Sequence, residues 1–176
     1  MADGILKVGT ITTSSGSGNI TIGSGVTLLS STPAFEAFLS ANATISDSTV
    51  TKVEFDTKVF DTDNCYDNST NYRFTPTVAG KYYVYSTLEI GSDTNTGLGT
   101  IAGYIYKNGS NYSSLGKVYN ANYIRRSEAT LSSIIDMNGT TDYLEMFTYI
   151  DVTSGTPTIF IDGARTTKFG AYKIGA

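Results

Sequence analysis

The ten residues from Lys81 to Ile90, KYYVYSTLEI, constrain the fold of this chain more than any other stretch. Their side chains fall into two sets at every second position. One set is Tyr82, Val84, Ser86, Leu88 and Ile90, and the other is Lys81, Tyr83, Tyr85, Thr87 and Glu89. A period of two residues is that of a β-strand, whose successive side chains point to opposite faces. We therefore predict a strand over residues 81–90.

Several other stretches show short strand patterns separated by turn-forming residues. The predicted strands lie at residues 33–41, 53–60, 100–107, 128–136, 143–151, 158–162 and 167–174. Asn108-Gly109 is a hairpin signal, and residues 61–70 (DTDNCYDNST) are nearly all turn-forming. No segment has a convincing helical period, and charged residues are only 16% of the chain. Eight to ten short strands with regular turns predict an antiparallel sandwich or jelly roll.

The first 32 residues differ from the remainder of the chain. They contain short β-like pieces separated by SSGSG and GSG, with apolar residues at every second position. Such a segment buries little apolar surface by itself. Two interpretations follow: a flexible leader, or an arm that becomes ordered by adding strands to a partner or to neighbouring copies. We expect residues 1–32 to be an extended attachment or assembly arm, and residues 33–176 to be the β-domain.

The spacing of aromatic, acidic and glycine residues in the centre of the chain resembles the core pattern of the C1q-like domain. The matching residues are Phe55, Asp61, Tyr66, Phe74, Gly80 and Tyr82. The segments 33–38, 104–109 and 167–174 resemble the family's first strand, a hairpin ending in Lys-Asn-Gly, and its closing strand. The resemblance covers about residues 33–176. It implies an all-β fold, an antiparallel C1q/TNF-like jelly-roll sandwich that carries the extended N-terminal arm.

The resemblance also implies an assembly and a recognition surface. C1q/TNF-like domains form compact trimers about a threefold axis, so we expect a homotrimer. The residues predicted for the trimer core are Tyr82, Val84, Tyr104, Phe147 and Phe169. We expect loops 91–99 and 110–126 to bind partners, because loops on a rigid sandwich commonly carry binding. The candidate binding residues there are Asp93, Asn95, Tyr112, Tyr119, Tyr123 and Arg125.

The composition excludes several kinds of chemistry. The chain has no histidine, which removes Ser-His-Asp and Cys-His catalysis and His-ligated zinc. Cys65 lies in an acidic loop that does not lower its pKa, so we interpret it as an incidental thiol. The glutamates Glu36, Glu54, Glu89, Glu128 and Glu145 are scattered along predicted strands. We expect no enzyme, although a paired-carboxylate glycosidase stays open as an alternative.

Charge and hydropathy limit the partners. The formal net charge is -4 and Arg125-Arg126 is the only basic pair, so we expect no nucleic-acid partner. No apolar run approaches a membrane span, so we expect no membrane insertion. The acidic loop offers oxygen atoms from Asp61, Asp63, Asn64 and Asp67 that suit Ca²⁺, but the spacing is not that of an EF-hand. We therefore predict no cofactor and keep calcium as the alternative.

The N-terminal arm resembles the leader segments of virion structural proteins from tailed phages. Together with the C1q/TNF resemblance, this implies a trimeric virion surface protein, either a head decoration or fibre protein or a tail-fibre tip. Residues 1–32 would attach it to other virion proteins, and residues 33–176 would stabilise the particle or bind a glycan or protein of the host surface. The N-terminus shows no signal-peptide pattern, so we expect synthesis in the host cytoplasm. A bacterial C1q-like adhesin or signalling-type ligand is the alternative.

Overall fold

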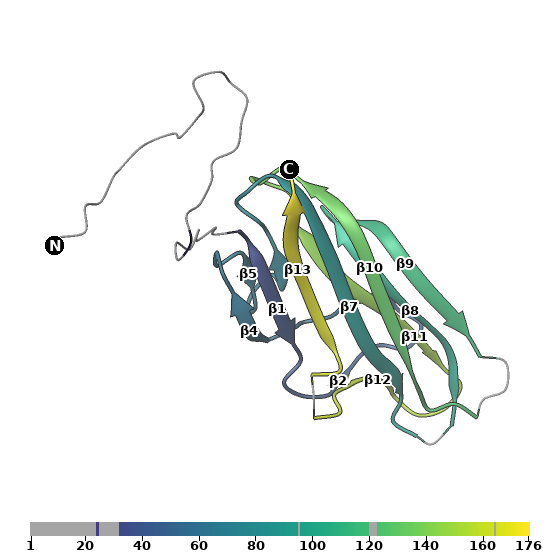
Figure 1. Ribbon diagram of the computed structural model, residues 1–176. Helices are drawn as coiled ribbons and strands as arrows, with labels where there is room; N and C mark the ends of the chain where they lie inside the picture. Colours follow the sequence, from purple (N-terminus) through teal and green to yellow (C-terminus); the bar gives the residue numbers. More distant parts are fainter. Residues whose placement is uncertain (1–23, 25–31, 95, 120–122, 164) are drawn as a thin grey trace. The chain divides into compact units, whose positions relative to one another are not determined.

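The computed structural model describes residues 24, 32–94, 96–119, 123–163 and 165–176, and is drawn in Figure 1. Residues Ser31–Ala176 form one compact unit, and every regular element described in it is a β-strand. No helix in these ranges has the length and apolar character needed to cross a membrane. The predicted arm lies outside the described residues except for Ser24 and Thr32, so it stays a prediction.

The first sheet is built around the longest strand of the domain. Its strands are β1 (Ala34–Phe38), β2 (Ala43–Thr44), β4 (Thr57–Asp61), β7 (Gly80–Ser92), β10 (Arg126–Met137), β12 (Pro157–Phe160) and β13 (Lys168–Gly175). The hydrogen-bonded order is β2-β12-β7-β13-β1-β4, and β10 also pairs with β7. In Figure 1 this sheet is the nearer layer.

The second sheet packs behind the first. Its strands are β3 (Thr51–Lys52), β5 (Tyr66–Asp67), β6 (Arg73–Phe74), β8 (Leu98–Lys107), β9 (Ser110–Val118) and β11 (Leu144–Val152). Their order is β5-β6-β11-β8-β9, and β3 also pairs with β11. Every strand pairing in both sheets is antiparallel. The predicted all-β jelly-roll sandwich is therefore confirmed.

The predicted strand at residues 81–90 is the centre of β7. Its five alternate residues from Tyr82 to Ile90 are buried, because this face of the strand points between the sheets. The predicted hairpin at Asn108-Gly109 joins β8 to β9, and both residues have positive φ, 53° and 77°. This is the backbone of a type I′ turn, which glycine and asparagine adopt at low cost.

Residues 111–126 were expected to contain a strand followed by a long loop. Ser110–Val118 forms strand β9 along the edge of the second sheet, so this part of the expected binding loop 110–126 is a strand. The segment has the composition of a turn, with three serines, an asparagine and a glycine. It becomes a strand because the tight turn at Asn108-Gly109 folds it back onto β8, which supplies the hydrogen-bonding partner.

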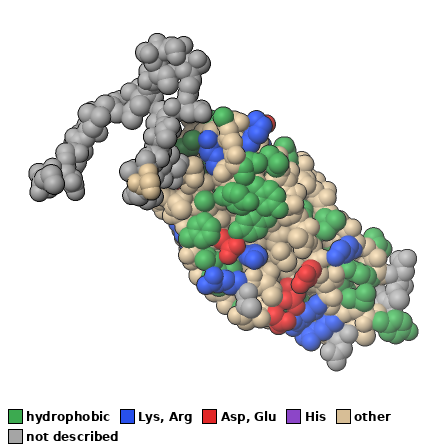
Figure 2. Space-filling view, viewed as in Figure 1, with side chains coloured by type: hydrophobic (Ala, Val, Ile, Leu, Met, Phe, Trp, Pro, Cys, Tyr) green, Lys and Arg blue, Asp and Glu red, His purple; other side chains and the backbone are tan. Residues whose placement is uncertain are grey.

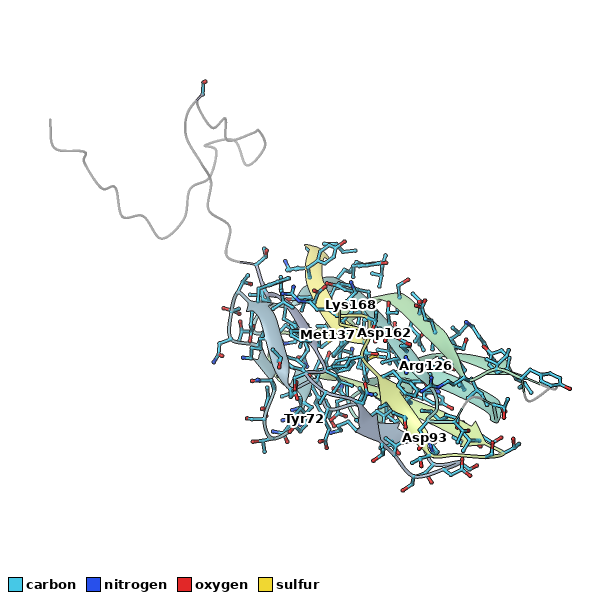
Figure 3. The ribbon with its side chains drawn as sticks, turned by 90° about the horizontal axis from the view of Figure 1, so that it is seen from below. Tyr72, Asp93, Arg126, Met137, Asp162 and Lys168 are labelled. Carbon is cyan, nitrogen blue, oxygen red and sulfur yellow. The ribbon has the colours of Figure 1, made fainter. Side chains whose placement is uncertain are left out.

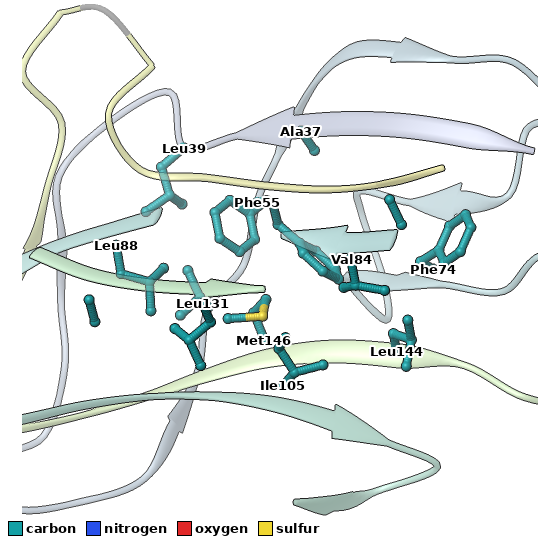
Figure 4. Close-up of a cluster of buried hydrophobic side chains, with 14 of the residues drawn as sticks. Ala37, Leu39, Phe55, Phe74, Val84, Leu88, Ile105, Leu131, Leu144 and Met146 are labelled. Carbon is teal, nitrogen blue, oxygen red and sulfur yellow. The ribbon is translucent and has the colours of Figure 1, made fainter. Parts of the chain in front are cut away.

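The core lies between the sheets and draws on both. Figure 4 shows Val84, Leu88 and Leu131 of the first sheet facing Ile105, Leu144 and Met146 of the second. Deeper aromatic packing occurs around Phe35, whose ring stacks on Tyr66 and Phe74 at centroid distances of 4.5 and 4.7 Å. The Phe169 ring meets the Phe35 ring edge-on at 5.0 Å. This cluster joins β1, β5, β6 and β13, and so connects the two sheets at one end of the sandwich.

Candidate functional site

The outer face of the first sheet carries a patch of aromatic and aliphatic side chains. Two rows of cross-strand neighbours form it. The first row is Ala34, Tyr172, Tyr83 and Ile134, and the second is Glu36, Gly170, Tyr85 and Ser132, on β1, β13, β7 and β10 in that order. Side chains directly opposite one another in an antiparallel sheet are close enough to touch. We call these two rows the sheet patch.

The sheet patch is open to solvent in the single chain. Ile134 is 55% exposed and Tyr172 is 46% exposed. The rings of Tyr83 and Tyr172 lie 5.5 Å apart, and those of Tyr83 and Tyr85 lie 6.1 Å apart. Figure 2 shows hydrophobic side chains gathered at the centre of this face. A contiguous exposed apolar surface on a soluble domain commonly marks an interaction site.

Tyr85 is held in a fixed position within the sheet patch. Its hydroxyl donates a hydrogen bond to Oε2 of Glu36 at 2.8 Å. Its ring lies over Gly170, where an added Cβ would approach the ring carbon Cζ to 2.4 Å. Burial and the hydrogen bond to Glu36 together raise the pKa of Tyr85 well above its usual range. The ring therefore needs glycine at position 170 and stays protonated at neutral pH.

Three of the five residues predicted for the trimer core are inside a single chain. Tyr82, Val84 and Phe169 are all fully buried between the two sheets. They have no surface left to offer another copy, so their assignment is corrected to the core of the sandwich. The physical reason is the direction of β7, which turns this face inward. The other two, Tyr104 and Phe147, are half-buried cross-strand neighbours on the outer face of the second sheet.

The predicted binding residues divide between the two ends of the sandwich. Tyr112 is exposed on β9, near the turn at residues 108–109. At the other end, the backbone carbonyl of Asp93 accepts a bond from Nη2 of Arg125 at 3.4 Å, and Tyr123 is exposed nearby in the chain. Tyr119 is half-buried against the core, and its hydroxyl donates to Ser127 Oγ. Asn95 lies outside the described residues.

A small charged cluster lies near Asp93 at that end of the first sheet. Nη1 of Arg126 contacts Glu89 Oε1 at 3.0 Å and Asp162 Oδ1 at 3.4 Å, and its guanidinium lies 3.7 Å from the centre of the Phe160 ring. Figure 3 labels Asp93, Arg126 and Asp162. The cluster shows that the Arg125-Arg126 pair is packed into the sheet.

Three of the five glutamates that left a glycosidase open have partners in the fold. Glu89 is bound by Arg126, Glu36 accepts from Tyr85, and the buried carboxylate of Glu145 pairs with Lys52 Nζ at 2.5 Å. Glu128 is the cross-strand neighbour of Glu89, and its side chain is exposed. The carboxylates Glu89, Glu36 and Glu145 thus serve ion pairs and hydrogen bonds that stabilise strands.

The acidic loop uses its carboxylates to hold its own backbone. Asp61 accepts from the backbone amides of Cys65 at 2.9 Å and Tyr66 at 3.1 Å, and from Lys58 Nζ at 2.8 Å. Burial raises the pKa of Asp61, but these donors lower it by more, so the net pKa is lowered. Burial and Asp61 raise the pKa of the Cys65 thiol far above its usual range, which leaves Cys65 protonated and unreactive.

The other two calcium candidates are bound in the same way. Asp63 accepts a hydrogen bond from the Thr77 hydroxyl, and Asp67 accepts from the backbone amides of Ser69, Thr70 and Asn71 at 3.0, 3.0 and 2.9 Å. In the part of the chain that the structure describes, no three metal-binding side chains meet at one point. The loop is therefore shaped by internal hydrogen bonds.

Asp67 provides a test of this internal bonding. The amides of Thr70, Ser69 and Asn71 hold the pKa of Asp67 well below its usual range. Its contribution to stability is complete above the pKa of an unfolded aspartate, about 3.9, and is lost as the pH falls through that value toward the folded pKa. We expect Asp67→Asn to lower the free energy of unfolding at pH 7, and we expect the difference from the wild type to narrow by about pH 3.

Urea unfolding of both proteins across this pH range measures the difference. Asp136→Asn is the matched control, because the Asp136 carboxylate is exposed and forms only a loose ion pair with Lys81 at 3.3 Å. A difference for Asp67→Asn that stays constant from neutral to acidic pH would contradict the expectation.

The sheet patch was not predicted as a site, although its signal is present in the sequence. Tyr83 and Tyr85 occupy the face of KYYVYSTLEI that also carries Lys81, Thr87 and Glu89. Two tyrosines on an otherwise polar strand face bring large rings to the surface, and tyrosine is enriched at protein interfaces. The partners of these residues, Tyr172 and Ile134, come from β13 and β10, and only the strand register brings them together.

The two antiparallel sheets form a jelly-roll sandwich, a fold that the chain shares with C1q and TNF domains of known structure. Among solved structures, the chain is similar to murine APRIL at pH 5.0, with a TM-score of 0.59 and 10% identity, covering 81% of this chain and 99% of that chain. It is similar to the globular domain of zebrafish complement 1qA protein, with a TM-score of 0.55 and 14% identity over 81% and 97%. It also resembles the Eiger TNF of S. frugiperda, with a TM-score of 0.55 and 11% identity over 82% and 92%. No protein-family pattern matches the sequence, and no curated protein matches it.

Proposed function

We propose that this protein is a non-enzymatic homotrimer that acts as a structural and recognition module. The sheet patch is the observation that carries the proposal. Tyr83, Tyr85, Tyr172 and Ile134 form one apolar surface on the outer face of the first sheet, and the single chain leaves it open. Tyrosine is enriched at protein interfaces because it combines a large rigid ring with a hydroxyl that tolerates water.

A ring of three copies needs two different surfaces on each chain, because each copy contacts one neighbour on each side. The sheet patch supplies one of them. The second is the edge of the second sheet at β9, where Leu115 and Val118 are exposed. Within the described residues, β9 has β8 on one side and no strand on the other. The C1q/TNF resemblance of the sequence implies the same threefold arrangement.

In its most specific form, the proposal is a virion surface protein of a tailed phage. Residues 1–32 attach the trimer to the particle, and residues 33–176 face outward. The resemblance of the arm to virion leader segments supports this role. A bacterial adhesin or signalling-type ligand is the second candidate, favoured by the fold that the chain shares with a TNF and with APRIL.

The first experiment is solution mass by light scattering, on the full chain and on residues 33–176, which include nearly all of the compact unit. We expect three times the mass of one chain for both. A trimer that forms only when residues 1–32 are present would show that the arm, and not the sheet patch, drives assembly. A monomer in both cases, at several concentrations, would contradict the proposal.

The virion role has a separate test. Peptides from residues 33–176 should be found by mass spectrometry in purified phage particles from the source culture. Treatment that removes loosely attached protein should leave them in place. Detection only in the culture fluid or on the bacterial surface would favour the adhesin.

A further inference from the structure

The segment from β4 to β6 lines an open polar cavity of about 520 Å³. All of its walls come from residues 58–75 of one chain, so it exists whatever the oligomeric state. The residues that matter here are Lys58, Asn64, Asn68, Ser69, Asn71 and Arg73. We propose that this cavity binds an acidic saccharide, with Arg73 receiving the carboxylate of a hexuronic acid unit. The inference goes beyond the proposed function because it names a ligand class and a site.

The cavity has a rigid frame. Asp67 is the one acidic residue in its lining. Both of its carboxylate oxygens accept hydrogen bonds from donors of the same loop, including the Asn71 side chain at 2.9 Å. Asn68 Nδ2 donates to the backbone carbonyl of Asp56 at 2.6 Å, which ties the loop to the segment before β4. Asn64 stands in the left-handed backbone region with φ 48°, which asparagine tolerates better than most residues. The walls are therefore formed before any ligand arrives.

Arg73 is the cation of this cavity that has no acidic partner among the described residues. Its guanidinium lies 4.5 Å from the centre of the Tyr143 ring, and this cation–π contact holds the guanidinium beside the ring. It forms no ion pair with any carboxylate in the described residues. A planar guanidinium can donate two parallel hydrogen bonds to one carboxylate. Lys58 adds a second cation to the lining, although its Nζ is paired with Asp61.

The remaining lining fits a sugar. Asparagine side chains offer a donor and an acceptor together, and serine offers a hydroxyl, which suits the neighbouring hydroxyls of a saccharide ring. The cavity is within the size range of small-molecule sites, about 300–1,000 Å³. A nucleotide fits less well, because the one aromatic side chain in the lining, Tyr66, is buried and stacked on Phe35 and leaves no ring face for a base. Arg73 is the one cation in the lining without an ion pair in the described residues, which favours a ligand that is negatively charged.

The test is an NMR titration of the full-length, ¹⁵N-labelled protein with trigalacturonic acid, up to about 10 mM. The matched ligand is its methyl ester, which keeps the ring hydroxyls and loses the carboxylate charge. Expected are shifts of the amide signals of residues 58–75, and binding that is at least about tenfold weaker for the ester. Sodium sulfate at the same ionic strength should not reproduce the shifts, because it offers charge without a sugar ring.

Two variants test Arg73 itself. Arg73→Gln should weaken binding by about tenfold or more, and Arg73→Lys should weaken it by less, because it keeps the charge and loses the paired donors. Arg165→Gln removes the same guanidinium charge before β13, where Arg165 lies 5.3 Å from the centre of the Phe38 ring, and should leave binding unchanged. Equal binding of acid and ester by the wild-type protein would overturn the proposal, as would shifts outside residues 58–75 or none. The acid and ester comparison needs no variant, so it decides the matter even where Arg73→Gln fails to fold.

Discussion

Replacing Phe35 with alanine is expected to lower the free energy of unfolding by about 3–5 kcal/mol. Phe35 is fully buried, and its ring contacts the rings of Tyr66, Phe74 and Phe169. Removing it leaves a cavity in a packed aromatic cluster that joins the two sheets, and rigid neighbouring rings fill such a cavity poorly. A loss of this size is a large part of the total stability of a typical domain, about 5–15 kcal/mol.

Chemical denaturation at one fixed protein concentration measures the change, since an oligomer's stability depends on concentration. Phe60→Ala is the matched control, because Phe60 is an aromatic residue on the adjacent strand β4 and is 44% exposed. We expect the control to change the stability by less than about 1 kcal/mol. Similar losses for both variants would show that the aromatic cluster is not the main connection between the sheets.

Replacing Ile134 with glutamate is expected to convert the proposed trimer into monomers. Ile134 lies opposite Tyr83, on strand β10 at one end of the sheet patch, and is largely exposed in one chain. A glutamate there meets water in the monomer but would be buried without a partner in the assembly. Burying an unpaired charge costs about 3 kcal/mol or more, which corresponds to about a hundredfold weaker association at each interface.

Light scattering and circular dichroism together separate assembly from folding. The variant should keep the β spectrum of the wild type and show the mass of one chain. Val50→Glu is the control, because Val50 is a 44% exposed apolar residue before β3, outside the sheet patch, and its change should leave the trimer intact. A trimeric Ile134→Glu protein would move the interface to another face.

The alternation in Lys81–Ile90 was sufficient to predict β7, and Asn108-Gly109 was sufficient to predict the hairpin between β8 and β9, because both signals are local. The direction of β7 was not predictable in the same way. Both of its faces carry tyrosines, so the sequence did not reveal that Tyr82 points inward and Tyr83 outward. That choice depends on which strands pack against each face, and those strands come from distant parts of the chain.

The shortest strands and the candidate sites could not be predicted from local sequence patterns, for a related reason. The strands β3, β5 and β6 have two residues each, too few to show a period. Arg73 reads as one polar residue in a loop, and its placement over Tyr143 depends on the pairing of β6 with β11. Pairing between distant strands is set by the whole fold, so its consequences for sites appear only with the structure.

The ring of Tyr85 lies over Gly170 and is tethered to Glu36, so it occupies one orientation before any neighbour arrives. Side chains that must give up several rotamers on association weaken binding by roughly 0.5–1.5 kcal/mol each. Tyr85 has already lost that freedom when the chain folds. Folding thus lowers the entropic cost of assembly in advance, and a tyrosine loosened by Glu36→Ala should make the proposed trimer dissociate faster without altering which surfaces meet.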